Sequence, residues 1–205
     1  MKNILILILC GLLSSSLLAV PVTDTRDPAQ IVEEATTGLM EELDTRREEF
    51  KANPALLREV VNADMLPLLD VEYSARLILG RGGRGATPEQ LSDFAGAMSE
   101  NLLNRYSEGL LGFESDTDLD VLPMKGKNTE KLTRVRTRFN LENGSSVPVD
   151  FAFRKTDLGW KAFDVTIEGI SYVMTYRNQI SPLVMKDGIE KVTEGIRAGN
   201  ISLEE

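Results

Sequence analysis

The stretch that decides the fold is residues 159–180, GWKAFDVTIEGISYVMTYRNQI. Its first half is rich in β-branched and aromatic residues, which suit the pleated, half-buried surface of a strand. Gly169 interrupts this pattern, and Ser171 is a residue type that caps the N-termini of helices. Apolar residues then recur at helical spacing, at Val173, Tyr176 and Ile180. The stretch therefore predicts an apolar strand that turns sharply into an amphipathic helix.

Further strands are predicted directly upstream of this stretch. Apolar residues and threonines alternate with Arg134, Arg136 and Arg138 in residues 131–141, and a similar alternation fills residues 147–154. The intervening Asn-Gly pair is typical of a hairpin turn, and a short strand is expected at 118–122. Together these segments predict an antiparallel meander with one apolar face and one solvated face, on which Asp150 can pair with an arginine.

Helical patterns surround the strands. Three helix starts are marked by a capping residue followed by proline, at Asp27–Pro28, Asn53–Pro54 and Thr87–Pro88. One helix is expected over 67–80, where Asp70 is better explained as a cap than as a catalytic group. Others are expected from residue 88 to about 111 and from 188 to about 198, with a bend or a restart at Pro182 and a frayed tail over 201–205. This order of elements favours an α+β single domain, with a curved antiparallel sheet covered by helices.

The amino-acid composition excludes several classes of function. The 205 residues carry a net charge of −9 and contain no His and one Cys, Cys10. The lack of His excludes Ser-His-Asp and Cys-His catalysis and argues against a zinc site. The acidic charge argues against nucleic acid or an anionic membrane as the main partner. We expect no cofactor and no metal.

The N-terminus has the pattern of a secretory signal peptide. Lys2 precedes a short apolar run over residues 4–9 and a serine-rich segment. The apolar run is short for a membrane span of about 20 residues. Cys10 comes too early for a lipoprotein site and follows the bulky Leu9. We therefore expect residues 1–20 to be a signal peptide and residues 21–205 to form the mature domain.

Two groups of residues resemble the MlaC/toluene-tolerance family, which consists of periplasmic phospholipid-binding proteins of Gram-negative bacteria. The first group is Trp160–Lys161, Asp164–Val165, Ile167–Glu168–Gly169–Ile170–Ser171 and Tyr176–Arg177. The second is the spacing of Pro67, Asp70, Ala75 and Leu79–Gly80. The resemblance implies an NTF2-like single domain in which a strongly curved sheet and its helices enclose a deep apolar pocket.

The same resemblance implies a phospholipid ligand, with acyl chains inside the pocket and the head group near its mouth. It also implies a location in the periplasm and two partners, an outer-membrane lipoprotein complex and an inner-membrane ABC transporter with a lipid-binding ring. The protein would thus help to maintain the lipid asymmetry of the outer membrane.

We expect the pocket walls to come from one helical stripe and from the apolar faces of the strands. The helical residues are Phe94, Met98, Leu102 and Tyr106, the sheet residues are Val135, Phe139, Val149, Phe151, Val165 and Ile167, and Ile170 and Val173 lie nearer the turn.

The glycine-rich loop 81–85 supplies candidate head-group contacts, Arg81 and Arg84, because backbone amides and arginine bind phosphate. The loop fits a plain linker between helices as well. The family often carries an aromatic residue just before Arg84, where this chain has Gly83.

Two other functions compete with lipid carriage. The first is an isomerase-type enzyme with an NTF2-like fold that acts on an apolar molecule, for which Asp150, Asp164 and Glu168 are the candidate acids or bases. The second is a periplasmic adaptor whose apolar residues pack into a solid core.

Overall fold

The computed structural model describes residues 23–112, 118–123, 128–141 and 144–203. The elements in chain order are α1 (Pro28–Ala52), α2 (Pro54–Asp64), η1 (Leu66–Leu68), α3 (Val71–Leu79), α4 (Pro88–Tyr106), η2 (Glu108–Gly112), β1 (Asp118–Leu122), β2 (Leu132–Asn140), β3 (Ser146–Thr156), β4 (Gly159–Ile167), β5 (Ile170–Ser171), α5 (Tyr172–Asp187) and α6 (Ile189–Arg197). The α and β elements are helices and strands, and η1 and η2 are short 3-10 turns. None of the described helices is long and apolar enough to span a bilayer.

The five strands form one antiparallel sheet in the order β1-β2-β3-β4-β5, which confirms the predicted meander. On β2, Val135 and Thr137 are buried, whereas Arg134 and Arg138 are exposed, so the predicted apolar and solvated faces are present. Asp150 pairs with Arg134 at 3.5 Å on the solvated face. The predicted Asn143–Gly144 turn lies partly outside the described residues.

A bulge on β4 breaks the strict alternation of its side chains. The register with β3 shifts between Ala152 and Phe153, which leaves Phe163 as the extra residue on β4. Consequently Ala162 and Val165 point to the same face of the sheet, although they are three positions apart. The aromatic ring of Phe163 turns to the other side and packs edge-on against Tyr73 of α3, with ring centroids 5.1 Å apart.

The predicted helix starts are confirmed. Asp27 and Thr87 each form a capping box, in which the cap side chain accepts a backbone N–H and a glutamine returns a bond to the cap backbone. Ser171 caps α5 by accepting the backbone N–H of Met174 at 3.1 Å. The turn before it is a two-residue hairpin in which Glu168 and Gly169 both have positive φ, 51° and 86°.

The prediction of a single helix over 67–80 is wrong. A 3-10 turn and α3 are separated by Leu69, which forms a parallel bridge with Ala162 of β4. The backbone N–H of Asp70 donates to the carbonyl of Ala162 at 2.7 Å, and pairing with a strand edge is incompatible with helical backbone. The carboxylate of Asp70 then caps α3 through the N–H of Tyr73, so the predicted role of Asp70 is confirmed.

The C-terminal part also differs from the expectation. The helix from Pro88 ends at Tyr106, not near residue 111, and is followed by η2. At Pro182 the helix does not restart, since α5 is one helix through that residue. The tail is not frayed up to Leu203, whose side chain is only 1% exposed and whose carbonyl accepts a hydrogen bond from Arg105. Residues 204 and 205 lie outside the described part of the chain.

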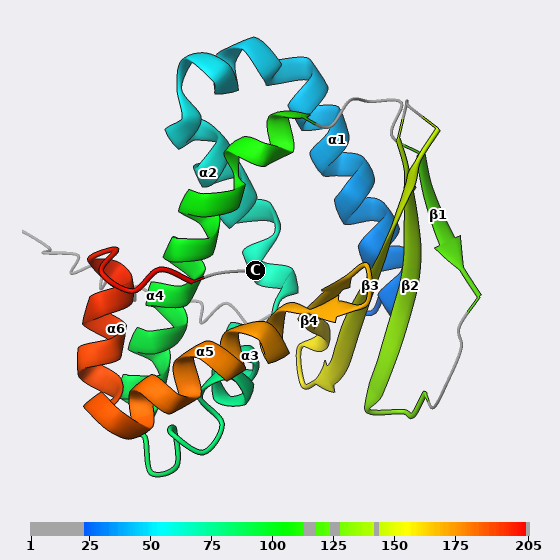
Figure 1. Ribbon diagram of the computed structural model, residues 1–205. Helices are drawn as coiled ribbons and strands as arrows, with labels where there is room; N and C mark the ends of the chain where they lie inside the picture. Colours follow the sequence, from blue (N-terminus) through cyan, green and yellow to red (C-terminus); the bar gives the residue numbers. More distant parts are fainter. Residues whose placement is uncertain (1–22, 113–117, 124–127, 142–143, 204–205) are drawn as a thin grey trace, which may run out of the picture.

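Figure 1 shows the sheet on one side of the molecule and α2 to α6 on the other, with α1 lying along the sheet. The buried apolar side chains fall into three clusters rather than one. The largest joins α3, α4, α5 and α6, and the second joins the start of α1 to β2, β3 and β4. The third joins the later part of α1 to α2, around Leu43, Phe50 and Leu57.

Candidate functional site

The predicted sheet residues share one face of the sheet. Val135, Phe151 and Val165 lie in one cross-strand row, and Val149 pairs with Ile167 in the next row. Phe139 lies on the same face of β2, four residues beyond Val135. The side chains of Val135 and Val149 are buried, and the other four predicted sheet residues are only half-buried.

The predicted helical residues lie mainly in the cluster of the helical layer. Phe94 and Met98 are 0% and 4% exposed, and they pack with residues of α3, α5 and α6. Val173 of α5 belongs to the same cluster, and Leu102 packs at its border. The hydroxyl of Tyr106 is 3.0 Å from that of Tyr176 on α5. Phe94 and Met98 are therefore brought together with α5, while Val135 belongs to the separate cluster beneath α1.

Seven of the twelve predicted wall residues keep part of their apolar surface accessible. Leu102, Tyr106, Phe139, Phe151, Val165 and Ile167 are half-buried, and Ile170 is 60% exposed at the β4–β5 turn. Fully burying a side chain of this size contributes about 1.5–3 kcal/mol, so a solid core would bury these groups. Each of these seven residues therefore keeps apolar surface that the protein itself covers only in part.

The sheet and the helical layer are joined at β4 by a polar junction that sequence reasoning missed. Arg154 of β3 pairs with Asp70 at 3.0 Å, and its guanidinium lies 4.4 Å from the ring centroid of Tyr73. The hydroxyl of Ser74 donates to the carbonyl of Phe163 at 2.7 Å. Arg154 carried no local signal, because its partners come from elements more than 70 residues away.

The three candidate carboxylates of the enzyme hypothesis have separate surroundings. Asp164 accepts the hydroxyl of Ser171 at 2.6 Å and the backbone N–H of Val173 at 3.0 Å, so it fixes the start of α5. Asp150 faces the arginines of β2, and Glu168 is exposed at the tip of the hairpin. No group of three or more His, Cys, Asp or Glu side chains in the described ranges is placed to hold a metal ion.

The first described segment crosses the β3–β4 turn. The N–H of Asp24 donates to the carbonyl of Leu158 at 3.0 Å, and a side chain at Gly159 would collide with the Asp24 backbone. Hydrogen bonds from the Arg26 guanidinium lower the pKa of the Asp24 carboxyl below its usual value, despite the opposing effect of burial. The same carboxylate and Glu34 raise the pKa of Arg26.

Two of the best-defined pockets lie on the surface of the described residues, and neither includes any of the twelve predicted wall residues. The first has a volume of about 280 Å³ and lies at the loop that follows α3, where Arg84 is one of its lining residues. Arg81, in the same loop, is exposed. The second is a shallow depression on the outer side of α4, where Asp93 pairs with Arg197 at 2.7 Å.

Comparisons with known proteins agree on one family. The model of the MlaC protein family matches residues 33–198. The toluene tolerance protein ttg2D of Pseudomonas putida is 25% identical over 171 residues, which cover 82% of this chain and 79% of that protein. The intermembrane phospholipid transport system binding protein MlaC of Haemophilus influenzae is 23% identical over 167 residues, covering 80% and 77% of the two chains.

A solved structure shares the fold. The phospholipid-binding protein of Ralstonia solanacearum, determined in complex with a phospholipid, superimposes with a TM-score of 0.76 at 22% identity. The match covers 85% of this chain and 97% of that one. The predicted α+β fold with a curved antiparallel sheet is therefore confirmed. Because the family model spans most of the sequence, the chain belongs to the MlaC protein family.

Proposed function

We propose that this protein binds a phospholipid and carries it across the periplasm, between an outer-membrane lipoprotein complex and an inner-membrane ABC transporter with a lipid-binding ring. In this role it would help to keep the lipids of the outer membrane asymmetric. Support comes from the relative named as an intermembrane phospholipid transport binding protein and from the phospholipid held by the Ralstonia protein.

The observation that carries the proposal is the half-buried apolar lining on the inner face of the sheet. Phe151, Val165 and Ile167 lie next to one another across β3 and β4, yet each keeps accessible apolar surface. Exposing an acyl chain to water costs a free energy of about 0.8 kcal/mol for each methylene group, and burial in a carrier removes this cost. A lining that the protein leaves partly uncovered suits a ligand of this kind, because both surfaces leave water on binding.

The proposed contacts divide into two sets according to burial. The half-buried residues contact the acyl chains directly, and they are Leu102, Tyr106, Phe139, Phe151, Val165 and Ile167. The buried residues flank this lining without contacting the ligand. Val135 and Val149 lie in the same rows of the sheet, and Phe94, Met98 and Val173 belong to the helical cluster. Ile170 lies on the outer turn, where a chain would enter. Arg81 and Arg84 stay a prediction as head-group contacts.

The proposal includes export of the protein. Residues 1–20 would be removed as a signal peptide, and residues 21–205 would form the mature carrier. The mature chain would appear in a periplasmic extract, shortened and without lipidation. Incorporation of labelled palmitate that depends on Cys10 would contradict this part of the proposal.

Native mass spectrometry of gently purified protein tests the function directly. The carrier hypothesis predicts a folded species heavier than the mature chain by the mass of one or more phospholipids, which extraction with organic solvent then identifies. A compact species without any ligand, obtained from cells with normal phospholipid content, would contradict it and favour an adaptor with a solid core.

A further inference from the structure

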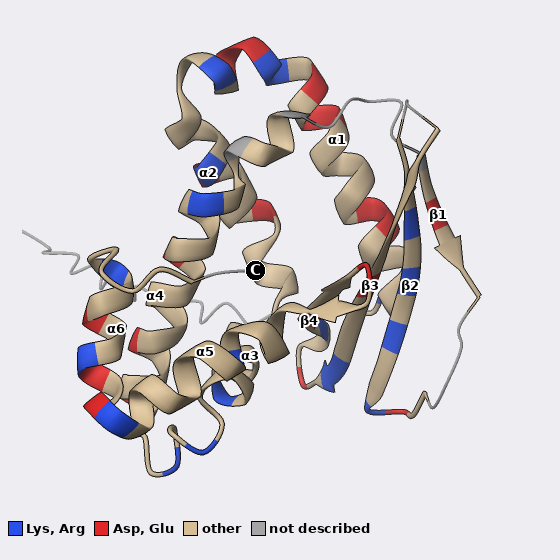
Figure 2. Ribbon diagram, in the orientation of Figure 1, with Lys and Arg blue, Asp and Glu red and all other residues tan. Residues whose placement is uncertain are grey.

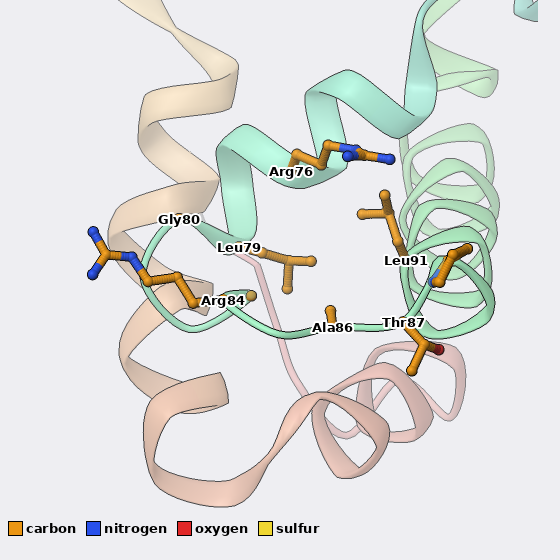
Figure 3. Close-up of a pocket in the computed structure, with 9 residues that line it drawn as sticks. Arg76, Leu79, Gly80, Arg84, Ala86, Thr87 and Leu91 are labelled. Atoms are coloured by element: carbon orange, nitrogen blue, oxygen red, sulfur yellow. The ribbon is translucent and has the colours of Figure 1, made fainter.

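A preformed pocket lies at the far end of α3, away from the sheet. Its walls come from the last turns of α3, the following loop and the first turn of α4, and its volume is about 280 Å³ (Figure 3). Leu79 and Leu91 contribute apolar surface and are only 1% and 5% exposed, so they are recessed rather than projecting. Ala86 and Pro88 complete the apolar part of the lining.

Two glycines hold the loop of this pocket in place. A Cβ atom on Gly83 would lie 2.6 Å from Cβ of Leu79, and one on Gly82 would lie 2.9 Å from the carbonyl oxygen of Ser181 on α5. The loop thus packs directly against α3 and α5 at positions that only glycine fits. This close packing fixes the position of the loop that forms one wall of the pocket.

Three arginines lie at this end of the molecule: Arg76 and Arg84 are among the lining residues of the pocket, and Arg81 is in the same loop. Arg76, Arg81 and Arg84 are exposed, and none forms an ion pair with any residue of the described ranges. Arg46 and Arg197, by contrast, are paired with carboxylates of the same chain, so Arg76, Arg81 and Arg84 are more available to an acidic partner. Figure 2 shows the basic residues of this loop together at one end of the molecule.

The directions of the arginines indicate the size of the occupant. In Figure 3 the side chain of Arg76 lies at the edge of the pocket near Leu91, while that of Arg84 extends away from it. A ligand confined to the pocket would therefore not reach both guanidinium groups. An occupant that pairs with both must extend beyond the pocket, as a stretch of polypeptide does.

We propose that this end of the molecule docks an acidic segment of a partner protein. One apolar side chain of the segment enters the pocket, and flanking carboxylates pair with Arg76, Arg81 and Arg84. A membrane surface fits less well, because the apolar residues are recessed and the chain is acidic overall. The inference does not rest on lipid carriage, since it uses none of the residues of the sheet lining. It assigns Arg81 and Arg84 to the partner segment in place of the lipid head group, and the phospholipid content of the arginine variant decides between the two roles.

The test measures binding of a fluorescein-labelled peptide, one leucine flanked on each side by three glutamates, to the mature protein by anisotropy at low ionic strength. We expect saturable binding that Arg76→Glu/Arg84→Glu weakens by about tenfold or more. The matched control is Arg136→Glu/Arg138→Glu, which makes the same change of charge at two arginines on the outer face of β2 that form no ion pair with another described residue. The control should weaken binding less than about twofold.

The role of the pocket is tested by changing the size of the side chains that would meet in it. Replacing the leucine of the peptide by glycine, or Ala86 by phenylalanine, should weaken binding severalfold, provided that the urea midpoint shows a folded variant. Three outcomes would overturn the proposal. The first is that the two arginine double variants weaken peptide binding equally. The second is that Arg76→Glu/Arg84→Glu loses copurified phospholipid. The third is that the protein binds phosphatidylglycerol vesicles instead of the peptide, in a way that depends on these arginines. The second outcome would make these arginines head-group contacts.

Discussion

The helical layer and the sheet use their apolar residues in different ways. In the helical layer, Phe94 and Ile180 are 0% exposed and belong to one large cluster. On the inner face of the sheet, Phe151 lies between Val135 and Val165 in the register, and both Phe151 and Val165 still remain half-buried. The difference shows that the helical layer packs as an ordinary core, while the sheet keeps apolar surface accessible.

The largest expected effect on stability comes from replacing one phenylalanine of each region by alanine. Phe94→Ala removes a fully buried ring and should lower the free energy of unfolding by about 3–5 kcal/mol. Phe151→Ala removes a half-buried ring and should cost less than half as much, because little new cavity forms. Urea unfolding of both variants, stripped of lipid, provides the comparison. Equal losses would show that the two regions are packed alike.

The junction between the two regions should contribute a smaller amount. Asp70→Ala removes both the cap of α3 and the partner of Arg154, and it should cost about 1–2 kcal/mol. Asp70→Asn keeps a capping oxygen and loses only the ion pair, so it should cost less than half of that. If both variants unfolded at the same urea concentration, the cap would contribute nothing and this explanation of Asp70 would fail.

Backbone strain at the β4–β5 turn offers a gain in stability. Glu168 has a φ of 51°, a conformation that costs a residue with a Cβ atom about 1 kcal/mol relative to glycine. Glu168→Gly should therefore raise the free energy of unfolding by up to about 1 kcal/mol. Gly169→Ala, at a φ of 86°, is the matched control and should lower it. A loss of stability in Glu168→Gly would mean that its side chain makes a contact that matters.

Stability should depend on pH only at acidic pH values. The pKa of Asp24 is lowered from 3.8 by hydrogen bonds from Arg26, and that of Asp187 is lowered from 3.8 by Lys191. The stabilisation from a lowered carboxyl pKa is complete above the unfolded value and disappears as pH falls through the folded value. Because the chain has no His, the urea midpoint should not change between about pH 6 and 8. It should decrease when the pH is lowered below about 4. Asp24→Asn should make that fall shallower, and an unchanged acid profile would contradict the assignment.

Local signals in the sequence were sufficient for much of the fold. The caps at Asp27, Thr87 and Ser171 and the alternation along β2 each depend on residues only a few positions apart, and all were predicted. The break at Leu69 was not, because it arises from pairing with Ala162, which lies far along the chain. Local pattern carries no information about such contacts.

The candidate site shows the same limit. Period-two spacing placed the sheet residues on one face, and helical spacing placed Phe94 and Met98 on one stripe. Spacing does not say how completely a face is covered, so the contrast between buried Phe94 and half-buried Val165 required the structure. The Arg154–Asp70 pair at the junction likewise could not be predicted from the sequence, since its two residues come from different layers of the fold.

The central claim is that the inner face of the sheet has room for acyl chains where the packed clusters do not. The most direct test compares Val165→Trp with Val135→Trp, two substitutions in the same cross-strand row at a half-buried and a 4% exposed position. Urea midpoints and extracted phospholipid per protein would be measured for both. We predict that Val135→Trp costs about 1–3 kcal/mol by overpacking, whereas Val165→Trp changes stability little and sharply lowers the bound phospholipid. Strong destabilisation by Val165→Trp with an unchanged phospholipid content in the folded fraction would contradict the account.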